Sequence, residues 1–116
     1  MNASASVKRA QSFALSLQRI EKARAGSIEA ARTTLARRLA IGIGTFENIA
    51  RARVKHIDDW VKDRLQALLI RELEAEHARL AHELDLARQG GDHPASQHIG
   101  AIETHLAAVS ALLKGT

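Results

Sequence analysis

The sequence contains no cysteine and a single proline, Pro94, among its 116 residues. The lack of cysteine excludes disulfide bonds and thiol chemistry, and it is compatible with a reducing compartment. Proline and glycine are the residues that most often interrupt helices, and a long segment in the second half of the chain contains neither. Alanine and aliphatic residues dominate the remainder, so the composition predicts an all-α fold.

Aromatic residues are almost as scarce, because the chain has only Phe13, Phe46 and Trp60. Proteins that bind RNA by stacking its bases need exposed aromatic side chains, so this scarcity argues against that mode of binding. A core with so few large apolar side chains, divided over two halves, would be marginally stable in a monomer. We therefore expect oligomerisation to add stability.

Long apolar runs are also absent. No segment approaches the roughly 20 consecutive apolar residues that a membrane-spanning helix needs. The N-terminal segment, MNASASVKRAQSF, lacks the apolar core of a signal peptide. We therefore expect a cytoplasmic protein without a membrane partner.

The two halves of the chain carry net charges of opposite sign. Residues 1–56 hold eleven Lys and Arg against three acids, which leaves a net charge of +8. Residues 57–116 hold six Lys and Arg against ten acids, which leaves a net charge of −4. This division predicts a module that binds a polyanion, joined to a second module with a different task.

A helix–turn–helix pattern occupies residues 32–51, RTTLARRLAIGIGTFENIAR. Leu35 and Leu39 share one face of a first helix, and Phe46 and Ile49 begin the apolar repeat again on a second helix. The small Ala36 allows the two helices to cross closely. A unit of this kind places its second helix in the major groove of DNA.

This stretch resembles the Cro/repressor-like helix–turn–helix family. The twenty-residue motif of that family has a small residue at its fifth place and apolar residues at five others, and all six match here: Ala36, Leu35, Leu39, Ile41, Phe46 and Ile49. The ninth place is usually glycine, because the turn often needs a left-handed residue, but here it is Ala40. Gly42 and Gly44 lie close by and offer a shifted turn.

The resemblance implies which residues face DNA, on the second helix and at the start of the first: Arg32, Ile43, Gly44, Thr45, Glu47, Asn48 and Arg51. By their chemistry, Asn48 suits adenine, Arg51 suits guanine or phosphate, and Glu47 accepts a hydrogen bond from cytosine. Arg53 and Lys55 follow the motif, and we expect them to grip the DNA backbone. No cofactor or small-molecule substrate is indicated.

The sequence predicts five helices, over residues 7–24, 28–39, about 43–53, 58–89 and 95–114. Gly26 would end the first helix and Ser27 would cap the second. The second helix would turn Ile28, Ala31, Leu35 and Leu39 inward. Asp58 or Asp59 would cap the long helix, whose first residues, Ile57, Trp60 and Val61, can pack on the helix–turn–helix.

Residues 57–116 predict an antiparallel helical hairpin. A turn at residues 90–94 reverses the chain, and apolar residues on the last helix recur at the spacing of a heptad seam. One hairpin has two apolar stripes and only one partner, so we expect two hairpins to form a four-helix bundle in a homodimer. The residues assigned to this interface are Leu69, Leu73, Leu80, Leu84, Ile99, Ile102, Leu106, Val109 and Leu113.

Catalytic and metal sites find little support in the sequence. His77 and His82 are five residues apart and His98 and His105 are seven apart, so neither pair has the i, i+4 spacing of a helical metal clamp. The acids Asp58, Asp59 and Asp63 are explained more simply as partners of a helix N-terminus. Because no nucleophile, base and orienting group converge in one motif, we do not expect an enzyme.

Together these patterns predict an all-α protein with a DNA-binding domain over residues 1–56 and a dimerisation hairpin over residues 57–116. They favour sequence-specific binding of double-stranded DNA by a homodimer that reads an inverted repeat. Such a protein would be a small transcriptional regulator of prokaryotic, phage or plasmid type. The alternative is a helical protein–protein interaction module, such as an antitoxin, an anti-activator or an adaptor, that acts through the hairpin.

Overall fold

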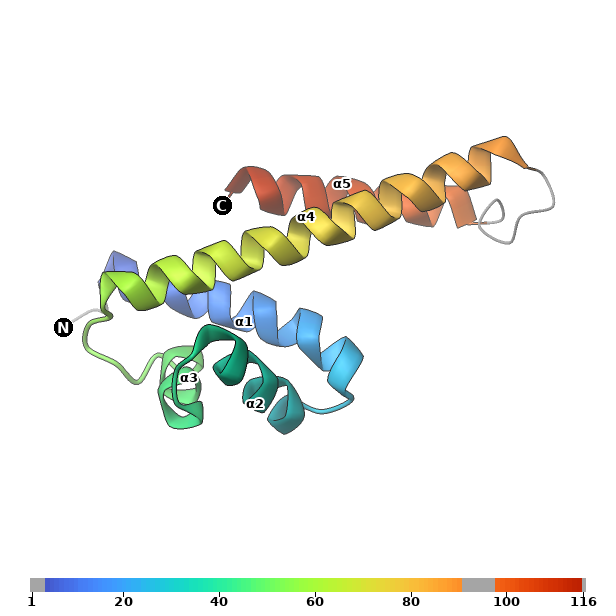
Figure 1. Ribbon diagram of the computed structural model, residues 1–116. Helices are drawn as coiled ribbons and strands as arrows, with labels where there is room; N and C mark the ends of the chain where they lie inside the picture. Colours follow the sequence, from blue (N-terminus) through green and yellow to red (C-terminus); the bar gives the residue numbers. More distant parts are fainter. Residues whose placement is uncertain (1–3, 91–97, 116) are drawn as a thin grey trace. The chain divides into compact units, whose positions relative to one another are not determined.

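The computed structural model describes residues 4–90 and 98–115, and the regular structure in these ranges is entirely helical, which confirms the predicted all-α class. The helices are α1 (Ala5–Ala25), α2 (Ile28–Leu39), α3 (Ile43–Ala50), α4 (Asp59–Gln89) and α5 (Ile99–Gly115) (Figure 1). The chain forms two compact units, Met1–Leu69 and Ile70–Thr116, and α4 contributes residues to both. The domain boundary proposed between residues 56 and 57 stays a prediction.

Local caps set the ends of α1 and α2. The Ser4 hydroxyl accepts a hydrogen bond from the Val7 N–H at 3.1 Å, so α1 begins at Ala5 rather than at the predicted residue 7. Gly26 ends α1 in the left-handed conformation, with a φ of 87°. The Ser27 hydroxyl accepts from the Ala30 N–H at 3.1 Å and caps α2, as the sequence predicted.

The turn between α2 and α3 is made by Ala40, and neither Gly42 nor Gly44 takes its place. Ala40 has a φ of 57° and a ψ of 44°, whereas Gly42 has an ordinary φ of −70°. The N–H of Ile41 donates to the Ala36 carbonyl at 3.0 Å, and the N–H of Ala40 donates to the Arg37 carbonyl at 3.1 Å. These two bonds close α2 as a Schellman motif, so the suggestion of a shifted turn is wrong.

Helix α3 ends at Ala50, earlier than the predicted residue 53. The reason is a second left-handed alanine, Ala52, with a φ of 56°. Around it, the N–H of Ala52 donates to the Ile49 carbonyl at 3.1 Å and the N–H of Arg53 to the Asn48 carbonyl at 2.7 Å. The pattern repeats the one that ends α2, and it places Arg53 beyond the helix.

The core of the first unit lies between α1, α2, α3 and the beginning of α4. Helices α2 and α3 pack on the same side of α1 (Figure 1). The largest fully buried side chains are Val7, Leu17, Leu35, Phe46, Ile49 and Leu65. Two residues that were predicted to face inward lie at the surface. Ile28 is the first residue of α2 and is 39% exposed, and Trp60 is 51% exposed. Val61 is buried.

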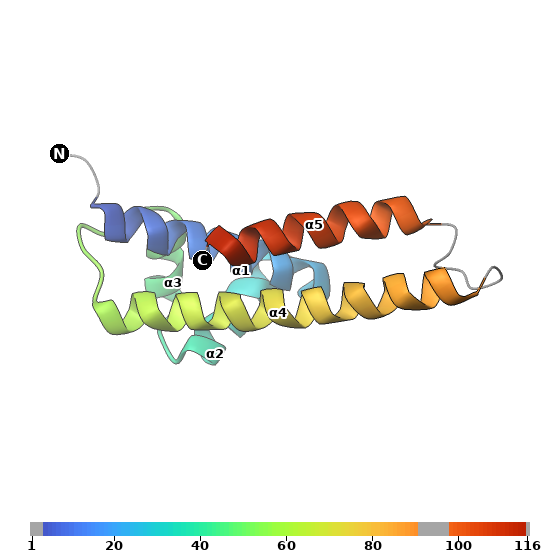
Figure 2. The same cartoon turned by 90° about the horizontal axis from the view of Figure 1, so that it is seen from above.

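The second unit consists of the later part of α4 and α5, which runs back alongside it (Figures 1 and 2). The apolar side chains buried in this unit are Leu73, Leu80, Leu84, Ala87, Ile102 and Val109. Arg88 on α4 forms an ion pair with Glu103 on α5 at 3.4 Å. The predicted turn at residues 90–94 and the first residues of the predicted helix 95–114 lie outside the described residues, apart from Gly90.

Candidate functional site

Helix α3 buries one face and presents the other to solvent. Phe46 and Ile49 are at most 2% exposed, and they anchor α3 in the core of the first unit. Asn48 and Arg51 are exposed and stand three residues apart, so they share one side of the helix. Thr45, three residues before Asn48, is exposed as well. Amide, guanidinium and hydroxyl groups are those that form hydrogen bonds with base edges and phosphates.

The C-terminal end of α3 is held by a side chain from α1. The Gln11 side-chain N–H donates to the Ala50 carbonyl at 3.1 Å, so it satisfies one of the carbonyls that a helix end leaves unpaired. Gly42 provides no side-chain cap at the opposite end, where the first N–H groups of α3 make a positive helix end. Sequence reasoning missed Gln11, because its acceptor is 39 residues away in the chain.

The C-terminal end of α2 is held in the same way by α4. Nη1 of Arg64 donates to the Leu39 carbonyl at 2.9 Å, directly before the turn at Ala40. The Arg64 guanidinium also lies 4.7 Å from the centre of the Trp60 ring, in a cation–π contact. The i, i+4 spacing of Trp60 and Arg64 is a sequence signal for that contact, although it does not identify the carbonyl that Arg64 binds.

Polar contacts also join α1 to α2. Arg32, expected to touch phosphate, is half-buried, and its Nε donates to Oε1 of Gln18 at 2.8 Å. Glu21, only 7% exposed, forms ion pairs with Arg24 at 3.3 Å and with Arg38 at 3.8 Å. Arg32 is thereby held against α1, and its contact with phosphate stays a prediction.

Exposed cations follow α3 in the chain, and another lies on α2. Arg53 and Lys55 are exposed in the segment between α3 and α4, and Arg37 is exposed on α2. The only acid within α3 is Glu47, which is half-buried. Ile43 is 45% exposed and Gly44 is exposed at the start of the helix. The structure thus brings the predicted DNA-facing residues onto α3 and the segment after it, with Arg32 set apart on α2.

Most residues assigned to the dimer interface are already buried in a single chain. Leu69 lies in the first unit, and the residues of the second unit are either buried or half-buried. The buried ones are Leu73, Leu80, Leu84, Ile102 and Val109, and the half-buried ones are Ile99, Leu106 and Leu113. Contact between α4 and α5 accounts for much of the apolar character that suggested a second chain. The dimer stays a prediction.

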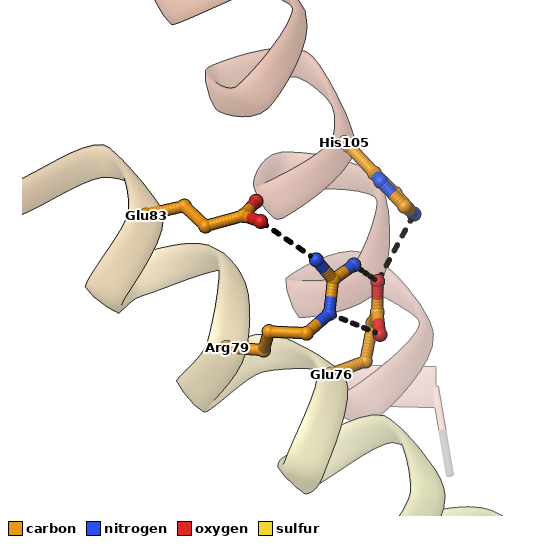
Figure 3. A network of polar contacts seen from close by, with 4 residues as sticks. All are labelled: Glu76, Arg79, Glu83 and His105. Atoms are coloured by element: carbon orange, nitrogen blue, oxygen red, sulfur yellow. Dashed lines mark hydrogen bonds and ion pairs between the residues drawn. The ribbon is translucent and has the colours of Figure 1, made fainter. Parts of the chain in front are cut away.

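Several acids of the second unit take part in surface ion pairs, and one histidine lies close to such a pair. Arg79 binds Glu76 and Glu83 on the same helix, the latter at 3.0 Å, and His105 on α5 lies 3.8 Å from Glu76 (Figure 3). The hydrogen bond with Glu76 raises the pKa of Arg79 above its usual value. Across the described residues, no group of three or more His, Asp and Glu side chains is placed to hold a metal ion.

Comparisons of the chain with protein-family models, curated proteins and solved structures find no match. No helix in the described ranges is both long enough and apolar enough to cross a membrane. The function is therefore argued from the geometry and charge of the two units.

Proposed function

We propose that this protein binds double-stranded DNA in a sequence-specific manner through the exposed side of α3. The observation that carries the proposal is that α3 has one buried and one exposed side, and that Arg51, its C-cap, continues the exposed side. Phe46 and Ile49 fix α3 in the core, while Asn48 and Arg51 project outward one turn apart. Side chains that read bases must be held on a rigid element, and these two have the donor and acceptor pattern for adenine and guanine.

Charge supports the same assignment. Residues 1–56 carry a net charge of +8, and the exposed Arg53 and Lys55 directly follow the helix that would enter the groove. Contacts with phosphate supply much of the affinity of such complexes and fix the register of the protein on the duplex. A polar helix face followed directly in the chain by exposed cations meets both requirements.

We propose further that the second unit joins two chains into a homodimer that acts as a small transcriptional regulator at an inverted repeat. Leu112 is 46% exposed, and Leu106 and Leu113 on the same helix are only half-buried. Exposed apolar surface of this kind is typical of an interface. The same surface favours a second candidate function, in which α5 binds a different protein.

The experiment that tests DNA recognition selects duplexes from a random pool with the intact chain and then measures their affinity for variants. We expect Asn48→Ala and Arg51→Ala each to cost about 1–3 kcal/mol of binding free energy for the selected sequence, because each removes a contact with a base. The fold should persist, since both side chains are exposed.

Arg71→Ala is the matched control, because Arg71 is an exposed cation of the second unit. It should leave the affinity unchanged. If no sequence is enriched by the selection, or if both α3 variants bind as tightly as the unaltered chain, the proposal for α3 is wrong and the protein-binding function gains support.

A further inference from the structure

The outward side of α1 carries a stripe of exposed residues that the proposed function does not use: Lys8, Ser12, Leu15, Arg19 and Lys22. We call this stripe the outer α1 face. Its members follow one another at intervals of four and three residues, so they lie in one row along the helix. The buried Ala10 and Leu17 point to the opposite side.

The positive charge of the outer α1 face is not neutralised by any ion pair in the described part of the chain. None of its three cations has an Asp or Glu three or four positions away, and none forms an ion pair within the described residues. The second unit differs, because Arg79 and Arg88 there both bind acids. A surface on which positive and negative charges alternate and pair is already soluble. A row of positive charges without acids is therefore not needed for solubility, and it indicates an anionic partner.

The outer α1 face and the exposed side of α3 point away from each other. Helices α2 and α3 pack on the buried side of α1, so its outer face is directed away from both (Figure 1). The exposed side of α3 lies opposite Phe46 and Ile49, which face the core. Packed helix axes are about 8–10 Å apart, so the body of the unit separates the two faces. One duplex cannot lie against both.

The chemistry of the row fits the phosphate backbone of DNA. Lys8 and Arg19 are about 16 Å apart along the helix, at about 1.5 Å per residue. This length spans about five phosphates of one strand, at about 3.4 Å each along the duplex axis. The row carries cations and no Asn or Gln, and phosphate oxygens accept hydrogen bonds from lysine and arginine whatever the base sequence, so the ligand is the backbone of a duplex of any sequence.

We infer that the outer α1 face binds a second DNA duplex without regard to sequence, so that one protein molecule bridges two duplexes. The bridging rests on the proposed function of α3, whereas binding of DNA by α1 does not. A protein with both sites holds distant segments of one DNA molecule together, which is an architectural function in addition to recognition of a single site.

The experiment mixes the intact chain with a donor-labelled duplex that carries the sequence selected for α3 and an acceptor-labelled duplex of unrelated sequence, and measures energy transfer between them. The test variant is K8Q/R19Q/K22Q, whose changes are all at exposed positions. The control R71Q/R88Q/K114Q removes the same charge from exposed positions of the second unit. A third variant, N48A/R51A, removes the proposed contacts of α3.

We expect the unaltered chain and the control to give energy transfer and K8Q/R19Q/K22Q to lose it while still binding one duplex. N48A/R51A should still bind a duplex through α1, and that binding should fall with salt by about 3 log units per log unit for three phosphate contacts. Salt-dependent binding by N48A/R51A that K8Q/R19Q/K22Q lacks would support the α1 site even if α3 binds no DNA.

Three results would overturn the inference. One is energy transfer in K8Q/R19Q/K22Q that is no lower than in the unaltered chain, which includes the case in which neither gives any. Another is an equal loss in the R71Q/R88Q/K114Q control, which would make total charge the cause. The third is a change of mass in K8Q/R19Q/K22Q by light scattering, which would make the outer α1 face a contact between protein chains.

Discussion

Two alanines in the left-handed conformation shape the candidate site. Ala40 ends α2 and Ala52 ends the turn after α3, each with the hydrogen bonds of a Schellman motif. Left-handed backbone costs alanine about 1–2 kcal/mol relative to its preferred conformation, whereas glycine adopts it freely. The surrounding hydrogen bonds and the buried neighbours Leu39 and Ala50 offset this cost.

Replacing either alanine with glycine should therefore stabilise the protein. We expect Ala40→Gly and Ala52→Gly each to raise the free energy of unfolding by about 1 kcal/mol, measured by urea denaturation at one protein concentration. Ala23→Gly is the control, because Ala23 lies at an exposed helical position of α1 and should lose about 0.5–1 kcal/mol. Destabilisation by Ala40→Gly would show that the alanine methyl group is needed in the turn.

Arg64 ties α4 to the end of α2, directly before the turn that leads to α3. Its guanidinium group donates a hydrogen bond to the Leu39 carbonyl and also contacts the Trp60 ring. We expect Arg64→Ala to lower the free energy of unfolding by about 1–2 kcal/mol, since a carbonyl at a helix end loses its charged donor.

The measurement that locates this effect is hydrogen exchange of the amides of residues 40–44. Arg64→Ala should raise their exchange rates more than it raises those of amides in the middle of α1, because the turn loosens before the core opens. Arg71→Ala should change neither quantity. An unchanged exchange rate at the turn would remove Arg64 from any role in positioning α3.

At the scale of elements, α3 depends on its neighbours for its existence. It spans Ile43–Ala50, which is shorter than the about 12 residues below which isolated helices are marginal in water. Its stability comes from Phe46 and Ile49 in the core and from the Gln11 bond to its last carbonyl. A helix fixed in this way keeps its outer side free for a ligand.

Helix α5 is the element on which the proposed dimer depends. We expect Leu106→Asp to convert a dimer to a monomer, because a charge in an apolar contact costs several kcal/mol. Light scattering at micromolar concentration measures the mass, and circular dichroism reports whether the helices persist. Ala111→Asp, at an exposed position of the same helix, should keep the dimer. A monomeric mass for the unaltered chain would contradict the dimer itself.

At the scale of the whole molecule, the charge division and the long α4 set how the protein would meet DNA. Helix α4 runs from Asp59 to Gln89 without Gly or Pro, so it contains no residue that favours a hinge. Two α3 helices in a two-fold dimer must enter the major groove on one face of the duplex. Half-sites should therefore lie about 10–10.5 base pairs apart, or a multiple of that spacing.

Changing the spacing of the half-sites tests this arrangement. An insertion of about 5 base pairs, half a turn, should abolish tight binding, and an insertion of about 10 should partly restore it. A gel-shift titration of the three duplexes at one salt concentration measures the effect. Equal affinity for all three would mean that the chains read single sites independently.

The sequence by itself determined the features that depend on neighbouring residues. The all-α class follows from composition, Gly26 and Ser27 mark a helix junction, and the 3.6-residue period identifies Leu35, Phe46 and Ile49 as core. These signals are local, because a cap or a helical face involves residues within one or two turns. The exposure of Asn48 and Arg51 follows from the same period.

Only the tertiary structure decided features that join distant parts of the chain. The sequence offered Gly42 and Gly44 as a shifted turn and predicted a longer α3, but Ala40 and Ala52 take the left-handed conformation, close to two carbonyls that bind side chains from α4 and α1. Gln11 and Arg64 reach carbonyls 39 and 25 residues away, which no spacing rule indicates. The reason is physical, since a side chain meets a distant partner only after the core has brought the two helices together.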